Sequence, residues 1–237
     1  VVLFVLWLLL FLSALIPNDM IRDNMEQSAL SYKERTAFEF TDGKKLNSVA
    51  DHYADSIWLN VSWNMGEDSP LISSIRTNYY DGGELGVNAG LYLSVTQGTE
   101  PNKDYTRYWH GTVMFIRLGH LITDVEGVKL IGFIAFLLLV GLTIFILARK
   151  RHWDLAVILA LSLAAVQIWN IRLSMEYQPG FILAFVLVPL FLILERRDDK
   201  WLTILSVVSG TAVAFFDFLT TETVTILIPL ALVIAVR

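Results

Sequence analysis

Long apolar runs alternate with one mixed, polar stretch along this chain. The apolar runs cover residues 1–16, 128–148, 155–173, 179–194, 201–219 and 223–236. A helix rises about 1.5 Å per residue against a hydrocarbon core of about 30 Å, so such runs predict membrane spans. We therefore expect an all-α polytopic membrane protein with about six transmembrane helices. A signal peptide is the alternative for residues 1–16, but no basic segment precedes the run and Ser13-Ala14-Leu15 is a poor cleavage site.

Residues 17–127 form the polar stretch, and we expect a large, mostly helical domain in water between the first and second spans. The segments "NMEQSALSYKERTAFEF" (24–40) and "LNSVADHYADSIWL" (46–59) have apolar residues at helical spacing. Four glycines make "NYYDGGELGVNAG" (78–90) rich in turns. The predicted organisation is a first transmembrane helix over 1–16, the outer domain over 17–127, and five transmembrane helices over 128–237.

Composition supports a membrane protein and excludes other classes. Hydrophobic residues make up 55% of the 237, and the mean hydropathy is +0.56, above that of a typical soluble domain. The net charge of −5 gives no sign of nucleic-acid binding, and the lack of cysteine excludes disulfides and thiolate metal sites. The chain begins at Val1 rather than Met and ends inside an apolar run, so we expect a fragment, with its last span truncated.

The basic loops predict the orientation. Residues 149–152 ("RKRH") and 195–200 ("ERRDDK") each carry three Lys or Arg, whereas 217–223 carries none. Basic loops stay in the cytoplasm. Residues 17–127, 172–179 and 217–223 then lie outside, and the unusual polar residues gather on that face.

Two acids follow the first apolar run in "LIPNDMIRDN" (15–24). Asp19 and Asp23 are four residues apart, so on a helix both carboxylates share one face. A carboxylate at a membrane edge tends to protonate, which suits a general base. Alternatively, the pair holds a divalent cation, or simply ends a span with polar residues.

The segment "YTRYWHGTVMFIRLGHLITD" (105–124) predicts a helix in the membrane interface. At 100° per residue, Arg107, His110 and Arg117 fall within about an 80° arc, with Trp109 and other apolar residues opposite. Such a cationic stripe can bind a phosphate, although the same side chains can also reach ordinary phospholipid head groups. His110 and His120 are too far apart for a zinc site.

Polar residues in the later outer segments are further candidates. Asp217 lies inside an apolar run and Glu222 just outside it, and an ionisable residue in a span is a functional candidate. The alternative for Asp217 is a structural ion pair. Arg172 is a candidate phosphate contact, or a partner of Glu176 four residues later.

This layout resembles the GT-C class of integral-membrane glycosyltransferases, which use polyprenyl-phosphate-linked sugars. The resemblance lies in an acidic pair after the first span, a long outer loop, and many short-looped spans. "RYWHG" (107–111) and "FFDFLTT" (215–221) are similar to stretches in multi-span proteins of bacterial surface-polysaccharide systems. The family often shows an acid-x-acid pair, whereas the spacing here is Asp-x-x-x-Asp.

The resemblance implies an enzyme of a bacterial plasma membrane that moves a sugar from a lipid-linked donor to a glycan, lipid or protein acceptor. Asp19 or Asp23 would be the catalytic base, and the donor phosphate would rest on Arg107, His110, Arg117 or Arg172. Asp217, Glu222 and Trp109 would position the substrates. No cofactor is implied beyond a divalent cation at the acidic pair. The alternatives are a polysaccharide transporter and a non-enzymatic sensor or structural protein, although the middles of the spans hold almost no charge to line a transport path.

Overall fold

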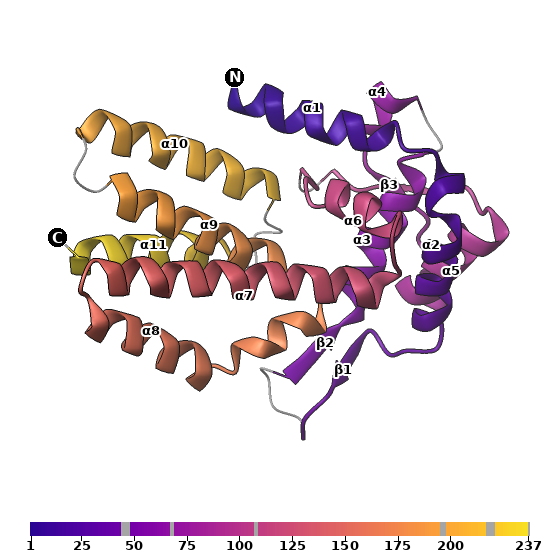
Figure 1. Cartoon of the computed structure of the whole chain (residues 1–237). Coiled ribbons are helices and arrows are strands. Elements are labelled where there is room, and N and C mark those ends of the chain that lie inside the picture. Colours follow the sequence, from indigo (N-terminus) through magenta and orange to yellow (C-terminus); the bar gives the residue numbers. More distant parts are fainter. Residues whose placement is uncertain (44–47, 67–68, 107–108, 195–197, 217–220, 237) are drawn as a thin grey trace. The chain divides into compact units, whose positions relative to one another are not determined.

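The computed structural model describes the whole chain except residues 44–47, 67–68, 107–108, 195–197, 217–220 and 237. The described chain is mostly helical and divides into two compact units. Unit 1 comprises residues 1–130 and 173–176, and unit 2 comprises 131–172 and 177–237. Figure 1 labels the α-helices and the strands β1, β2 and β3.

Unit 1 is built around a buried helix, α3 (His52–Asn64). The Asp51 side chain begins this helix by accepting a hydrogen bond of 2.9 Å from the Ala54 amide, which is a typical N-terminal cap. Around α3 pack α2 (Asn18–Tyr32), α5 (Val87–Gln97) and α6 (Val113–His120). The covering helix α2 buries Ile21, Met25, Ala29 and Tyr32 at the spacing of one helix face.

Short elements complete unit 1. Strand β1 (Phe38–Phe40) pairs antiparallel with β2 (Val49–Asp51), and β3 (Asn78–Tyr79) pairs antiparallel with β4 (Lys103–Asp104). The remaining pieces are α1 (Val2–Ala14), α4 (Pro70–Ser73), the 3-10 helix η2 (Gly83–Leu85) and the first six residues of α7 (Val125–Arg149). The helix expected over 105–124 is observed only as α6, and the helix expected over 24–40 gives way to strand β1.

Unit 2 contains the rest of α7 with α8 (Trp153–Ala165), η3 (Ile168–Leu173, shared with unit 1), α9 (Gln178–Leu194), α10 (Asp199–Phe216) and α11 (Glu222–Val236). The helix α9 packs against both α10 and α11. In its core, the rings of Phe136 and Phe185 meet edge to face at 5.4 Å. Gly180 lets α11 approach, because a Cβ there would lie 1.7 Å from Oγ1 of Thr221.

The prediction of about six transmembrane helices is wrong. Among the described helices, two are long and apolar enough to cross a membrane, namely α7 with 25 residues and α10 with 18. A third span is possible only if α1 and α2 are taken together, and they are bent by 85° with respect to each other. The other apolar helices of unit 2 are shorter, with 13 residues in α8 (Trp153–Ala165), 17 in α9 and 15 in α11.

Breaks in the helices explain why the structure has fewer membrane-spanning helices than the apolar runs predicted. The run 155–173 was expected to be one span, but α8 ends at Ala165, and Gln167 adopts a positive φ of 54° before the separate helix η3 begins. A positive φ cannot continue a right-handed α-helix. After α1, Pro17 starts α2 in a new direction. The apolar runs therefore predicted hydrophobic helices correctly, but they did not predict the lengths of these helices or how many of them cross a membrane.

Candidate functional site

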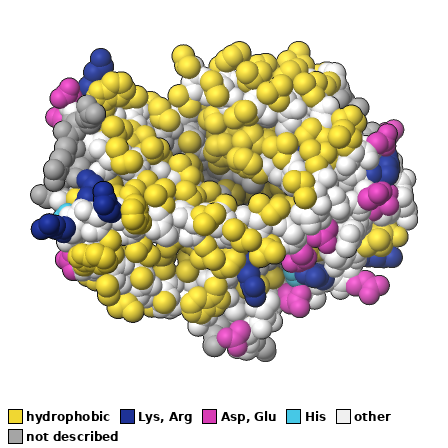
Figure 2. All heavy atoms as spheres, viewed as in Figure 1, with side chains coloured by type: hydrophobic (Ala, Val, Ile, Leu, Met, Phe, Trp, Pro, Cys, Tyr) yellow, Lys and Arg dark blue, Asp and Glu magenta, His cyan; other side chains and the backbone are white. Residues whose placement is uncertain are grey.

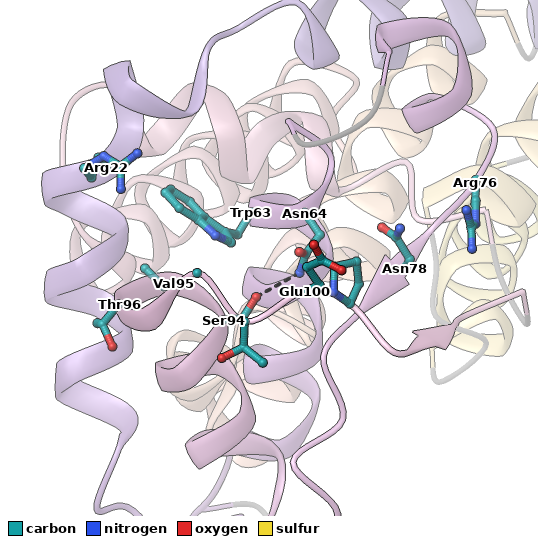
Figure 3. A pocket seen from close by; sticks show the side chains of 12 residues that line it. Arg22, Trp63, Asn64, Arg76, Asn78, Ser94, Val95, Thr96 and Glu100 are labelled. Carbon is teal, nitrogen blue, oxygen red and sulfur yellow. Dashed lines mark hydrogen bonds between the residues drawn. The ribbon is translucent and has the colours of Figure 1, made fainter.

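A cleft of about 460 Å³ lies in unit 1 (Figure 3). Arg22 comes from α2, the end of α3 contributes Trp63 and Asn64, and α5 with the loop after it forms another wall. The lining is mostly polar. It consists of Arg22, Trp63, Asn64, Arg76, Asn78, Ser94, Val95, Thr96, Gly98, Thr99, Glu100 and Pro101.

One side of the cleft carries an aromatic side chain beneath a cation. The guanidinium carbon of Arg22 lies 5.3 Å from the ring centroid of Trp63, within the range of a cation–π interaction. Trp63 is 4% exposed, so packing holds its ring in place. The same guanidinium donates to Asp19 Oδ1 at 2.9 Å and lies 3.9 Å from Glu26. Arg22 thus connects the cleft wall to one of the acids that the sequence singled out.

A chain of amides fixes the centre of the cleft. Nδ2 of Asn64 donates to Oδ1 of Asn60 at 2.7 Å and lies 3.1 Å from Oγ of Ser94. Asn60 in turn donates to the Tyr80 carbonyl at 3.0 Å and accepts from the Tyr80 amide at 3.1 Å. These bonds tie the end of α3 to α5 and to the chain after β3, so the polar lining has a defined geometry before any ligand binds.

Arg76 lies at the opposite side from Arg22 in the view of Figure 3, and Glu100 lies near the centre of the view. Nε of Arg76 donates to Oδ1 of Asp104 at 2.8 Å, across the pair of strands β3 and β4. The loop that carries Glu100 leaves α5 through Gly98, whose φ of +64° is the left-handed conformation that often ends a helix.

This combination of side chains suits a carbohydrate. Amides, guanidinium groups and a carboxylate can bond the hydroxyl groups of a sugar, while the buried indole of Trp63 supports Arg22 in the cleft wall. Two arginines in the lining also favour a ligand that carries negative charge. The site is therefore a candidate for a sugar or a phosphorylated sugar.

The acids Asp19 and Asp23 lie on α2, as the helical spacing predicted. The side chain of Asp19 is 87% exposed and is held by Arg22, and Asp23 is exposed as well. Among the described residues, no group of three His, Cys, Asp or Glu is placed to bind a metal ion. The sequence did not predict that Arg22, which lies between the two acids, would line the cleft.

Arg117 is fully buried rather than displayed on a surface. Its guanidinium donates to the carbonyls of Ser13 at 3.1 Å, Ser62 at 2.5 Å and Ile16, and to Oδ1 of Asn18 at 3.1 Å. Burial lowers its pKa to about 10, so it remains charged at neutral pH. Arg117 therefore joins the ends of α1 and α3 to the start of α2.

This junction also positions the cleft. Asn18, the side chain that accepts from Arg117, donates through Nδ2 to the Trp63 carbonyl at 3.1 Å. The side chain of Asn18 thus connects Arg117 to Trp63, the aromatic residue of the cleft. In the structure it supports the cleft wall through Asn18.

The other predicted residues are spread over both units. In unit 1, His110 is 5% exposed, with its ring centroid 4.7 Å from that of Tyr105, and Trp109 is 51% exposed. Burial lowers the pKa of His110 to about 4, so its imidazole is neutral at pH 7. Arg172 is exposed in unit 2, and Glu222 begins α11 there. Arg107, Asp217 and the side chain of Glu222 lie outside the described residues.

A buried ion pair in unit 1 was missed by the sequence analysis. Nζ of Lys129 lies 3.1 Å from Oδ2 of Asp55, and the two side chains are 3% and 0% exposed. The Tyr32 hydroxyl donates to the same carboxylate oxygen at 2.9 Å and lies 2.5 Å from Nζ of Lys129. Burial, and then the charge of Asp55, raise the pKa of Tyr32 well above its usual value. One signal was available, because Lys129 is an ionisable residue inside an expected span.

The second carboxylate oxygen of Asp55 is also satisfied. Oδ1 accepts from Oγ of Ser174 and from the Met175 amide, both at 2.7 Å. Near it, burial raises the pKa of Asp51. Because the described partners satisfy both oxygens of Asp55, we assign this network to the stability of unit 1 rather than to substrate binding.

No protein-family model, curated protein or solved structure matches this chain.

Proposed function

We propose that the protein is a membrane-bound glycosyltransferase. It would move a sugar from a lipid-phosphate donor to an acceptor on the extracytoplasmic face, in cell-surface glycan assembly. The observation that carries this proposal is the polar cleft with Trp63 in its wall, joined through Arg22 to Asp19. The two helices long enough to cross a membrane are compatible with a lipid-linked donor.

The proposed orientation follows from α7. The basic segment 149–152 comes directly at the end of this helix. By the positive-inside rule that end lies in the cytoplasm. Because α7 is long enough to cross, its first residues and the attached unit 1 would then lie on the outer face, where the cleft would meet the donor and the acceptor.

The chemistry of the proposal is a displacement at the anomeric carbon. Asp19 or Asp23 takes the proton from an acceptor hydroxyl as its oxygen forms the new bond to the anomeric carbon. The bond between that carbon and the phosphate oxygen breaks, and the lipid phosphate leaves with the electron pair. Arg22 and Arg76, the guanidinium groups that line the cleft, are placed to offset the charge on the phosphate. Glu100 would orient sugar hydroxyl groups.

Binding of a glycan without transfer is the second candidate. It is favoured by the ion pair of Asp19 with Arg22, because one oxygen of this carboxylate is already bonded to a guanidinium 2.9 Å away. The two candidates share the cleft and differ in whether an acid acts on the acceptor.

Transfer in isolated membranes distinguishes the two candidates. Membranes that contain the full chain are supplied with polyprenyl-phosphate sugars carrying a radioactive label, and label in the acceptor fraction is counted. We expect Asp19→Asn or Asp23→Asn to lower transfer at least tenfold at equal expression. Glu34→Gln, at an exposed acid beyond the end of α2, is the matched control and should retain transfer. Full transfer in both Asp variants would refute the base assignment.

A further inference from the structure

Three elements of unit 1 expose large apolar side chains together. They are α1, α4 with the residues after it, and α6, and α1 packs against both of the others. Figure 2 shows hydrophobic side chains across the upper part of the view, where α1 lies in Figure 1. The exposed side chains include Leu8 and Leu12 of α1, Leu71, Ile72 and Ile75 at α4, and Phe115, Leu118 and Ile122 at α6.

The helix α6 is apolar on two opposite faces. One face is buried in unit 1 and carries Val113 and Ile116. The other exposes Phe115 at 53% and Leu118 at 48%, and Ile122 just beyond the helix is 78% exposed. A surface helix in water would carry polar residues there. Its exposed face therefore calls for an apolar environment.

Residues 70–75 present a second apolar surface. Leu71 is 54% exposed, Ile72 is 49% and Ile75 is 72%. The segment is tied to α1, because Nε1 of Trp7 donates to Oγ of Ser74 at 3.1 Å. The position of this segment therefore follows the position of α1.

The helices α6 and α4 contact α1 at different positions along its axis. Arg117 holds the Ser13 carbonyl near the carboxyl end of α1, whereas Trp7 contacts Ser74 six residues earlier. At about 1.5 Å per residue, the contact with α4 lies about 9 Å further along the helix axis. Val2–Ala14 carries no charged side chain. The middle of α1 therefore also favours an apolar environment.

The connection to α7 identifies the environment as lipid. Only residues 121–124 separate α6 from α7, which is long and apolar enough to cross a membrane. Five Cα–Cα steps reach at most about 18 Å, so the end of α6 lies close to the membrane surface that α7 enters. A bilayer that surrounds α7 would therefore extend to α6.

We propose that α4 and α6 insert beside α1 into one leaflet of the lipid bilayer. Leu71, Ile72 and Ile75 then contact acyl chains, and Phe115, Leu118 and Ile122 contact the boundary between acyl chains and head groups. The sequence expectation already placed a helix over 105–124 in the membrane interface, and it placed the rest of residues 17–127 in water, so the insertion of α4 is the part that differs from it. The insertion fixes unit 1 against the membrane at several points, and it does not depend on the proposed glycosyltransferase activity.

The test uses the fact that the chain has no cysteine. Ile72→Cys, Ile122→Cys and the control Glu84→Cys, at an exposed charged residue of η2, each accept one nitroxide label. The labelled full chain is reconstituted into vesicles of phosphatidylcholine and phosphatidylglycerol. Collisions of each nitroxide with oxygen, which concentrates in lipid, and with a water-soluble nickel chelate are measured by electron paramagnetic resonance.

We expect the labels at 72 and 122 to collide at least threefold more with oxygen than with the nickel chelate, and the label at 84 to show the reverse. Nickel collisions at 72 as frequent as those at 84 would place α4 in water and overturn the proposal. Shielding of 72 from both reagents would mean that protein covers this surface, which also overturns it. Leu71→Cys is the second variant, in case Ile72→Cys fails to fold.

Discussion

The ammonium group of Lys129 lies 3.1 Å from the carboxylate of Asp55, and both side chains are withdrawn from solvent. Lys129 belongs to the first turns of α7, the longest described helix, and Asp55 to the central helix of unit 1. The pair therefore ties the beginning of a candidate membrane span into the core of the polar domain.

Lys129→Ala should lower the free energy of unfolding by about 3–5 kcal/mol, because it leaves a buried carboxylate without its cation. The double variant Asp55→Asn/Lys129→Met should cost less than the sum of the two single changes, since neither charge remains. Denaturant unfolding in detergent, followed by tryptophan fluorescence, measures both. The exposed pair of Arg76 and Asp104, which does not touch Lys129, is the control, and Asp104→Asn should cost less than about 1 kcal/mol. Strictly additive effects at Asp55 and Lys129 would contradict this account.

Arg117→Ala should destabilise unit 1 by about 3 kcal/mol or more, because four oxygen atoms lose their donor. Arg117→Lys should restore only part of the loss, since one ammonium cannot reproduce the fork of a guanidinium. Arg76→Lys at the exposed side of the cleft is the matched change and should alter stability by less than about 0.5 kcal/mol. Thermal unfolding of the three variants in detergent is the measurement. Stability unchanged by Arg117→Ala would show that this buried junction contributes nothing.

Acid should weaken the fold through two buried histidines. Burial lowers the pKa of His110 and of His120 to about 4, whereas an unfolded histidine titrates near 6.5. Between these values the unfolded chain binds protons that the folded chain does not bind. The stabilisation is therefore complete above about pH 6.5 and is lost as the pH falls to 4, by up to about 3 kcal/mol for each histidine.

The measurement is the free energy of unfolding at several pH values between 7 and 4. Carboxylates also titrate in this range, so the wild type is compared with His110→Asn/His120→Gln. We expect a shallower decline with acid in the variant between pH 6.5 and 4.5. Parallel curves for the two proteins would rule out the histidines as the cause.

In unit 2, Gly180→Ala should weaken the packing of α9 against α11. The added Cβ would lie 1.7 Å from Oγ1 of Thr221 and 3.1 Å from Oγ1 of Thr225, so the side chains must shift. We expect a loss of about 1–3 kcal/mol, typical of overpacking. Gly141→Ala in α7 is the matched control, because no atom lies within 4 Å of its added Cβ. Unfolding in mixed micelles compares the two, and an equal effect of both changes would contradict the close approach at Gly180.

Local patterns in the sequence predicted only part of the local structure. The helical spacing of the two acids on α2 is confirmed, whereas the helix expected over 24–40 gives way to β1 and the one expected over 105–124 is reduced to α6. The number of spans was wrong because hydropathy does not report where a helix ends. The positive φ of Gln167 and the 85° bend between α1 and α2 depend on packing and backbone geometry that apolar runs do not reveal.

The cleft and the buried ion pair could not be foreseen, because their residues are far apart in the chain. Arg22, Trp63, Arg76 and Ser94 come together only after α2, α3 and α5 pack. Lys129 lies 74 residues after Asp55, and no local spacing joins them. For Arg117, the sequence predicted a role that the structure does not support. Its position on a helix suggested a contact with a phosphate, but its guanidinium donates to protein oxygen atoms.

The most direct test of the proposed function is native mass spectrometry of the full chain, purified gently from its own membranes. The account predicts a bound mass that matches a polyprenyl-phosphate sugar. That mass should be lost in Arg22→Ala/Arg76→Ala, which removes the guanidinium groups of the cleft, and retained in Lys33→Ala, at an exposed cation near the end of α2. Only ordinary phospholipid, bound equally by all three proteins, would contradict the assignment of the cleft to a lipid-linked sugar.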